Sequence, residues 1–165
     1  MSNESNDWGE SAQDSELSLK SLPKDWTGFT RAQKIEKQTA VIQHQMVRVR
    51  RGAFNTVDAP RVAAMVLDTQ MEMAEFIADA EAAALRAKHL SDFIEADKIT
   101  KIGKEFVAEG KKVSETALKR MATVSDEVKE SKEAMVEAGQ EYKKWRDIHS
   151  MLASAHVFFR NFGKA

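Results

Sequence analysis

The chain has 165 residues, of which 42% are hydrophobic and 31% are charged, and it contains no cysteine. This composition suits one helical domain with a tail, and it excludes a disulfide framework and thiolate metal sites. The sequence predicts no membrane-spanning helix, because no run approaches about 18 consecutive apolar residues. The polar, acidic start also lacks the pattern of a signal peptide, so we expect a cytoplasmic protein.

Residues 1–29 carry six acidic side chains against two lysines and have little apolar content. This pattern predicts a disordered acidic tail that ends in a linker around Trp26 and Phe29. We interpret the tail as solubilising, with competition for the basic regions of the chain as the alternative. The two aromatic side chains are expected to pack on the helical core, and docking of a partner is the alternative.

A first helix is predicted up to Arg51, between a capping Thr30 and a terminating Gly52. A long second helix is predicted from Pro60 to at least Asp97, and its continuation to Gly110 stays open. In both helices mostly apolar residues recur at alternating spacings of three and four, the period of coiled coils. The seam residues are Ala32, Ile35, Thr39, Ile42, Met46 and Val49 in the first helix, and Val62, Val66, Thr69, Met73, Phe76, Ala80, Ala83, Ala87, Leu90 and Ile94 in the second.

The short loop at 52–59 predicts that these helices form an antiparallel hairpin over residues 30–110. Beyond Asp97 the apolar stripe continues in a new phase, which indicates a stutter or a helix break. Residues 111–165 are predicted to form a C-terminal helical segment. Within it, Ser114 is placed to cap a short helix, and Thr123 with Asp126 resembles the start of a final helix that ends near Asn161.

The fold class is therefore all-α: an antiparallel hairpin of long coiled-coil helices and a C-terminal oligomerising helix. Each seam is too narrow to form a core alone, so we expect a homo-oligomer. Its predicted interface lies on the final helix, where the apolar seam sharpens. The predicted interface residues are Trp145, Ile148, Leu152, Phe159 and Phe162.

No catalytic constellation is visible in the sequence, and we expect a protein that is not an enzyme and needs no cofactor or metal. His149 and His156 lie seven residues apart, or about 10 Å along a helix, which is too far to share one metal ion within a chain. The neighbouring carboxylates, such as Asp79 and Glu81, are typical of solvated helix faces. No glycine-rich phosphate loop is present.

Two basic blocks stand out against the net charge of −1. Basic residues outnumber acidic ones six to one over 30–51 and seven to three over 98–124. Clusters of one sign are the footprint that a phosphate backbone requires, and Phe54 near the first block suits base stacking. The alternatives are charges that offset the negative end of the first helix and an ordinary exposed helix face. The candidate nucleic-acid-binding residues are Arg48, Arg50 and Arg51 in the first block, and Lys98, Lys101, Lys104, Lys111, Lys112, Lys119 and Arg120 in the second.

The segment Lys112-Val113-Ser114-Glu115-Thr116-Ala117-Leu118-Lys119, followed by Asp126-Glu127-Val128 and a charged helix with an aromatic-rich end, resembles the UvsY-like recombination mediators of tailed phages. The resemblance covers roughly residues 98–165. It implies a small helical protein in the host cytoplasm that forms rings, binds single-stranded DNA and works with a recombinase and a single-strand-binding protein. It also implies DNA contacts along the second basic block and assembly through the final helix.

The leading hypothesis is a non-enzymatic, oligomeric single-stranded nucleic-acid-binding protein. The alternative is a structural or adaptor coiled-coil protein, such as a virion or scaffold component, in which every charge serves helix pairing. The sequence does not distinguish DNA from RNA.

Overall fold

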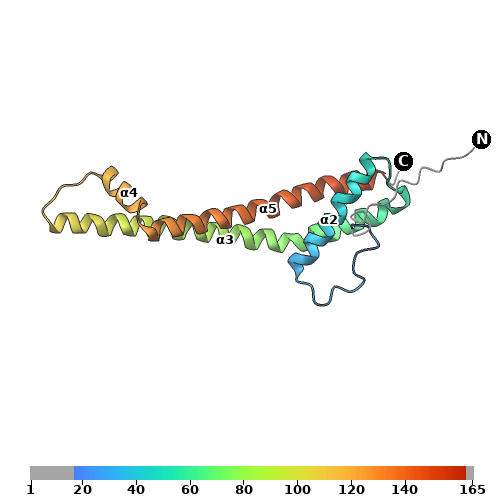
Figure 1. Ribbon diagram of the computed structural model, residues 1–165, viewed down its shortest axis with the longest axis horizontal. Helices are drawn as coiled ribbons and strands as arrows, with labels where there is room; N and C mark the ends of the chain where they lie inside the picture. The colour runs from blue at the N-terminus through green and yellow to red at the C-terminus, as the bar shows by residue number, and fades with distance from the viewer. Residues whose placement is uncertain (1–16, 163–165) are drawn as a thin grey trace, which may run out of the picture. The chain divides into compact units, whose positions relative to one another are not determined.

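The computed structural model describes residues 17–162, and every regular element in that range is helical. The predicted all-α fold is confirmed (Figure 1). The acidic tail and linker were predicted over residues 1–29; residues 1–16 lie outside the described residues, and in the remainder Leu19 is buried. The elements are α2 (Arg31–Arg50), the 3-10 helix η1 (Thr56–Asp58), α3 (Ala59–Ala108), α4 (Glu115–Thr123) and α5 (Asp126–Phe162).

Local hydrogen bonds define the starts of the helices. Thr30 begins α2 with a capping box, because its hydroxyl accepts from the backbone N–H of Gln33 at 3.2 Å and the Gln33 side chain accepts from the backbone N–H of Thr30 at 2.9 Å. Ser114 caps α4 as predicted. The predicted cap at Thr123 is wrong, since this residue ends α4 and its hydroxyl donates to the carbonyl oxygen of Lys119 at 2.8 Å.

Glycines terminate α2 and α3. Gly52 and Gly110 have φ angles of 70° and 69°, a region that costs a residue with a Cβ about 1–2 kcal/mol. After α2 the N–H of Ala53 donates to the carbonyl oxygen of Arg48 at 2.9 Å, which is the long bond of a Schellman motif. The same arrangement closes α3, so this helix is continuous to Ala108.

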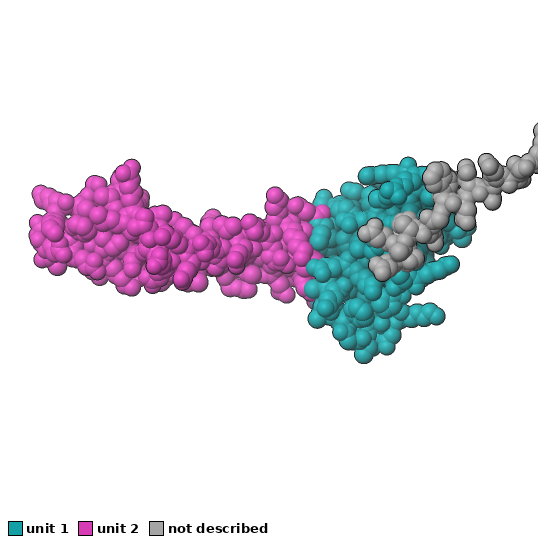
Figure 2. Space-filling model, viewed as in Figure 1, with its two compact units in different colours: residues 1–74, 148–165 teal, residues 75–147 magenta. Residues whose placement is uncertain are grey.

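The chain divides into two compact units, and the division crosses α3 and α5 (Figure 2). Unit 1 comprises residues 1–74 and 148–165, and unit 2 comprises residues 75–147. Each of the two long helices therefore contributes one part to each unit. The sequence suggested a boundary between residues 110 and 111. The division differs from it because the last part of α5, from residue 148, packs in the same unit as residues 1–74.

Unit 1 has a packed core to which three helices contribute. Its α2–α3 hairpin is antiparallel as predicted, because Lys34 near the start of α2 pairs with Glu72, and Thr69 donates a hydrogen bond to Gln38 at 3.2 Å. Helix α2 buries Val41 in addition to its predicted seam, so its buried face is broader than a two-helix contact needs. The largest fully buried apolar side chains are Ile35, Val41, Ile42, Val62, Val66, Met73, Leu152 and Phe159.

An aromatic cluster joins the loop after α2 to the end of α5. The ring of Phe54 lies 5.4 Å from Phe159 and 5.8 Å from Phe162, and Phe158 lies 5.2 Å from Phe159. These separations are typical of favourable aromatic pairs. Phe54, predicted as a partner for bases, is therefore occupied within unit 1.

Part of the predicted subunit interface on α5 is used inside the chain instead. Trp145 is only 4% exposed, and Leu152 and Phe159 are fully buried, while Ile148 and Phe162 are half-buried. These side chains are buried because the apolar seam of α5 packs against helices of its own chain. These side chains stabilise the fold of one copy, and the three buried ones present no surface to a second.

Unit 2 is an antiparallel pair made from the later part of α3 and the earlier part of α5. Near one end the rings of Phe76 and Trp145 lie 5.4 Å apart. Farther along, the hydroxyls of Ser91 and Ser131 are hydrogen-bonded at 3.3 Å. On these two helices the buried side chains of unit 2 are Ser91, Val128, Ser131 and Trp145, so this unit buries few large apolar side chains.

The seam predicted for α3 shifts phase by one residue within unit 2. Leu90, predicted as a seam residue, is 58% exposed, and the neighbouring Ser91 is 2% exposed. The sequence predicted this change of phase beyond Asp97. In the structure it comes earlier, by Ser91. Helix α4 lies against the last part of α3, where a Cβ on Gly103 would contact the side chain of Leu118 at 3.6 Å.

Candidate nucleic-acid interface

The predicted lysine row lies at the end of α3, in the following loop and on α4, all within unit 2. Four of its seven members pair with carboxylates. The pairs are Lys98 with Glu127 at 3.4 Å, Lys101 with Asp97 at 2.7 Å, Lys111 with Glu109 at 2.7 Å, and Lys119 with Glu115 at 2.7 Å. Exposed pairs of this kind contribute little to stability, but each carboxylate offsets the positive potential that a phosphate would meet.

The pKa values of this row follow the same pairing. The hydrogen bond from Lys101 to Asp97, reinforced by their charges, raises the pKa of the Lys101 ammonium. The hydrogen bond between Lys119 and Glu115 raises the pKa of the lysine and lowers that of the carboxyl. Lys101 and Lys119 are therefore held in their charged forms by the carboxylates beside them.

Three members of the row remain available. Within residues 17–162, no ion pair forms at Lys104, Lys112 or Arg120. Unit 2 as a whole carries 14 basic and 16 acidic side chains. The lysine row is thus a local feature on a unit without an excess of positive charge.

In unit 1 the basic side chains are concentrated in the residues that the structure describes, which carry ten basic and five acidic side chains. The whole unit, with residues 1–16 and 163–165, carries 11 basic and 10 acidic side chains and is nearly neutral. The basic residues are Lys20, Lys24, Arg31, Lys34, Lys37, Arg48, Arg50, Arg51, Arg61 and Arg160, and the acidic residues are Asp25, Glu36, Asp58, Asp68 and Glu72.

The three predicted arginines at the end of α2 have different environments. Arg50 and Arg51 are exposed, and Arg48 is half-buried. The Nη2 of Arg48 donates to the carbonyl oxygen of Ala53 at 3.0 Å, so this guanidinium also stabilises the helix end, as the alternative interpretation expected. One hydrogen bond leaves most of the donors of a guanidinium for other partners.

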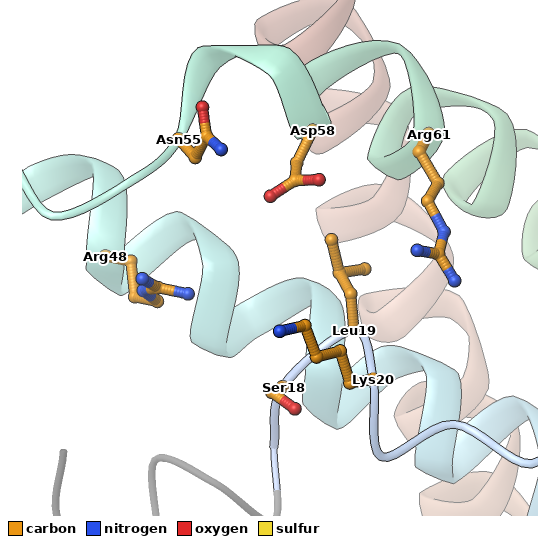
Figure 3. A pocket seen from close by; sticks show the side chains of 7 residues that line it. All are labelled: Ser18, Leu19, Lys20, Arg48, Asn55, Asp58 and Arg61. Atoms are coloured by element: carbon orange, nitrogen blue, oxygen red, sulfur yellow. The ribbon is translucent and has the colours of Figure 1, made fainter.

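Arg48 also lines a cavity of about 490 Å³ between α2, η1, the start of α3 and residues 18–20 (Figure 3). Lys20 and Arg61 bring two further cations to it, and Asp58 brings one carboxylate. Asn55 lies at the rim, where its side chain accepts from the backbone N–H of Val57 at 3.1 Å. The lining thus carries a net positive charge and many N–H donors.

A second cavity of about 340 Å³ lies beside Trp26. Arg61 lines both cavities, and Asp68 and Lys24 also contribute to the second. The ring of Trp26 contacts Phe29 edge-on, with centroids 5.4 Å apart at 75°. The Nζ of Lys34 lies 5.8 Å from the centre of the Trp26 ring, so a cation lies beside this aromatic group.

Sequence reasoning missed Lys20 and Arg61 as members of this cluster. Lys20 was assigned to the acidic tail, and Arg61 lies outside both basic blocks, 30–51 and 98–124. Only the hairpin and the packing of Leu19, which is buried, bring them beside Arg48. The sequence did contain one signal of this site, the aromatic residues Trp26 and Phe29 before α2. They were expected to pack on the helical core.

The described residues 17–162 contain no cluster of three or more histidine or acidic side chains that is arranged to hold a metal ion. None of the helices in this range combines the length and apolar character needed to cross a bilayer. The chain matches no protein-family model, no curated protein and no solved structure.

Proposed function

We propose that this protein is a non-enzymatic, oligomeric single-stranded nucleic-acid-binding protein whose main phosphate contacts come from unit 1. The observation that carries the proposal is the cluster of Lys20, Arg48 and Arg61 around one cavity, in the described part of that unit, where ten basic side chains outnumber five acidic ones. A surface with this excess attracts a phosphate backbone and releases counterions when it binds.

The aromatic residues of unit 1 support a single strand as the ligand. Phe29 is 42% exposed and lies beside Trp26, and the Nζ of Lys37 lies 5.5 Å from the centre of the Phe29 ring. Single-strand-binding surfaces combine cations with aromatic faces on which unpaired bases stack. The bases of a duplex are already stacked and paired, so they gain nothing from such a platform.

Self-association is proposed through the outward face of α3 in unit 2 rather than through the seam of α5. Leu85 and Phe93 are 52% and 69% exposed on that helix. Leu85, Ala96 and Val107 recur every eleven residues, which is about three helical turns, so they lie on one line of exposed side chains. An exposed apolar stripe of this length marks an interaction surface, and a second copy of the chain carries the same stripe.

The alternative function, a structural or adaptor coiled coil, is favoured by one specific observation. Four of the seven residues in the lysine row have carboxylate partners within their own chain. In this function the basic residues organise helix ends and connections. No nucleic acid is then needed to explain them.

The two functions predict different responses to salt. We would titrate a fluorescent single-stranded oligonucleotide with the full chain and follow anisotropy at low and high salt, with a duplex of the same length as the control. We expect tight binding that favours the single strand and weakens steeply as salt rises. Absence of binding at low salt would overturn the proposal and leave the coiled-coil adaptor.

Matched charge reversals then locate the phosphate contacts. The double variant Arg50→Glu/Arg51→Glu changes exposed residues of unit 1, and Lys104→Glu/Lys112→Glu changes the lysine row by the same charge. We expect the first pair to weaken binding more. Molecular mass from light scattering checks assembly in parallel, and Phe93→Glu is expected to lower that mass without loss of helicity.

A further inference from the structure

We infer that the two cavities joined at Arg61 form one site for a segment of single-stranded nucleic acid, with a phosphate in the first cavity and an unpaired base against Trp26 in the second. The inference rests on the proposed function and adds the place and the residues at which the strand is held. Arg61 is the one described residue that lines both cavities, so it is positioned to connect a phosphate with its own base.

The first cavity has the chemistry of a phosphate site. Lys20, Arg48 and Arg61 come from three separate segments and line the same space (Figure 3). Guanidinium groups bind phosphate through two parallel N–H donors, and an ammonium adds a point charge. Asp58 opposes them with one negative charge, which leaves an excess of positive charge in the lining.

Arg61 is free to bind a ligand. Its side chain is exposed, and within the described range 17–162 it forms no ion pair, although Asp58 and Asp68 line the same cavities. A phosphate oxygen would supply the missing partner.

The second cavity has the chemistry of a base site. Trp26 supplies an aromatic ring to its lining; Phe29 contacts that ring edge-on, and the Nζ of Lys34 lies 5.8 Å from its centre. The carboxylate of Asp68 only accepts hydrogen bonds, so it suits the amino group of a base. Both cavities fall in the size range of small-ligand sites, about 300–1,000 Å³.

An unpaired strand fits this arrangement better than a duplex does. A base reaches an aromatic face beside a phosphate site only when it is unstacked and turned out of a helix. Inorganic phosphate alone would occupy the first cavity and leave Trp26 unused. The test therefore examines the phosphate and base contacts separately.

The first test compares Arg61→Ala with Arg86→Ala in the full chain. Both variants remove one exposed arginine from α3, but Arg86 lies in unit 2 and lines neither cavity. We expect Arg61→Ala to weaken binding of the single-stranded oligonucleotide about tenfold and to reduce its salt dependence by about one phosphate contact. Arg86→Ala should stay within about twofold of the unchanged chain, and circular dichroism checks that both variants are folded.

The second test examines the base contact. An oligonucleotide that carries 5-iodouracil is photocrosslinked to the full chain, which is then cut with trypsin. We expect the crosslink in the fragment 25–31, which contains Trp26 and Phe29, and we expect its yield to fall in Arg61→Ala. The variant Trp26→Leu should weaken binding by about fivefold or more, since stacking of one base on an aromatic ring is a substantial part of such affinity.

Each outcome has one meaning. If the unchanged chain fails to bind at low salt, the proposed function fails and this inference fails with it. If the chain binds but Arg61→Ala behaves like Arg86→Ala and the crosslink falls near Lys104 and Lys112, the function stands and the site inferred here is wrong. If Arg61→Ala weakens binding but Trp26→Leu does not, the cavity binds phosphate alone and the placement of the base is overturned.

Discussion

The two units of this protein are built from parts of the same long helices, yet they are stabilised in different ways. Unit 1 buries large apolar side chains such as Ile35, Leu152 and Phe159 from three helices. Unit 2 buries few large side chains between its two helices, among them Val128 and Trp145, and leaves Leu85 and Phe93 exposed. A continuous heptad pattern along a helix therefore does not indicate equal burial along it, because burial depends on how many neighbours each part of the helix has.

Charge separates the units as clearly as packing does. Unit 1 has an excess of basic side chains around cavities, whereas unit 2 interleaves lysines with carboxylates along its surface. The sequence placed the longer basic block in the part that became unit 2. Its excess of positive charge is reduced there because helical spacing puts a carboxylate four residues away from Lys101 and from Lys119.

The largest expected effect tests the difference in packing. Leu152→Ala removes a fully buried side chain from unit 1 and should lower the free energy of unfolding by about 2–5 kcal/mol. Leu90→Ala is the matched change at an exposed leucine of unit 2 and should alter it by no more than about 0.5 kcal/mol. Urea unfolding followed by circular dichroism measures both. Equal losses would mean that Leu90 is buried in the assembled protein.

A smaller effect tests how far unit 2 depends on its backbone rather than on its core. Gly110→Ala places a Cβ at a φ of 69° and should destabilise the end of α3 by about 1–2 kcal/mol. Gly103→Ala lies within α3, where the new methyl group would contact Leu118 at an ordinary 3.6 Å. It should stabilise the protein by about 0.5–1 kcal/mol, and thermal unfolding of both variants should give shifts of opposite sign.

The smallest effect concerns the surface pairs of unit 2. Because the pKa of the Glu115 carboxyl is lowered in the folded chain, its contribution to stability is present above the ordinary glutamate pKa and is lost as the pH falls through the folded value. An NMR titration of the Glu115 side chain should show a midpoint below the ordinary range. In Lys119→Met the midpoint should return toward that range, and an unchanged midpoint would contradict the pairing.

Periodicity and capping residues were enough to predict the helices. Thr30, Gly52, Gly110 and Ser114 each act as their residue types indicate, because caps and Schellman motifs depend on a few neighbouring residues. The antiparallel hairpin followed from the short loop after α2. These features are local, and a single sequence contains what determines them.

The return of α5 could not be predicted in the same way. Its seam residues Trp145, Leu152 and Phe159 have the same pattern whether they contact another copy or their own chain, so periodicity alone did not decide between them. The clustering of Lys20 with Arg48 and Arg61 was equally hidden, because it depends on contacts between distant parts of the chain. The predicted binding role of the lysine row and of the three arginines stays a prediction.

The hydrogen bond between the hydroxyls of Ser91 and Ser131 helps to set the register of the two helices in unit 2. Seam positions repeat every seven residues, so two such helices could also pair one heptad out of alignment. Sliding would separate the two hydroxyls: Ser131 would keep its bond to the carbonyl oxygen of Val128 at 2.9 Å, but the buried hydroxyl of Ser91 would lose its partner on the other helix, at a cost of about 1–3 kcal/mol. One pair of small polar residues thus selects a single alignment of α3 and α5, and with it the positions of Lys98 opposite Glu127 and of Lys132 opposite Glu95.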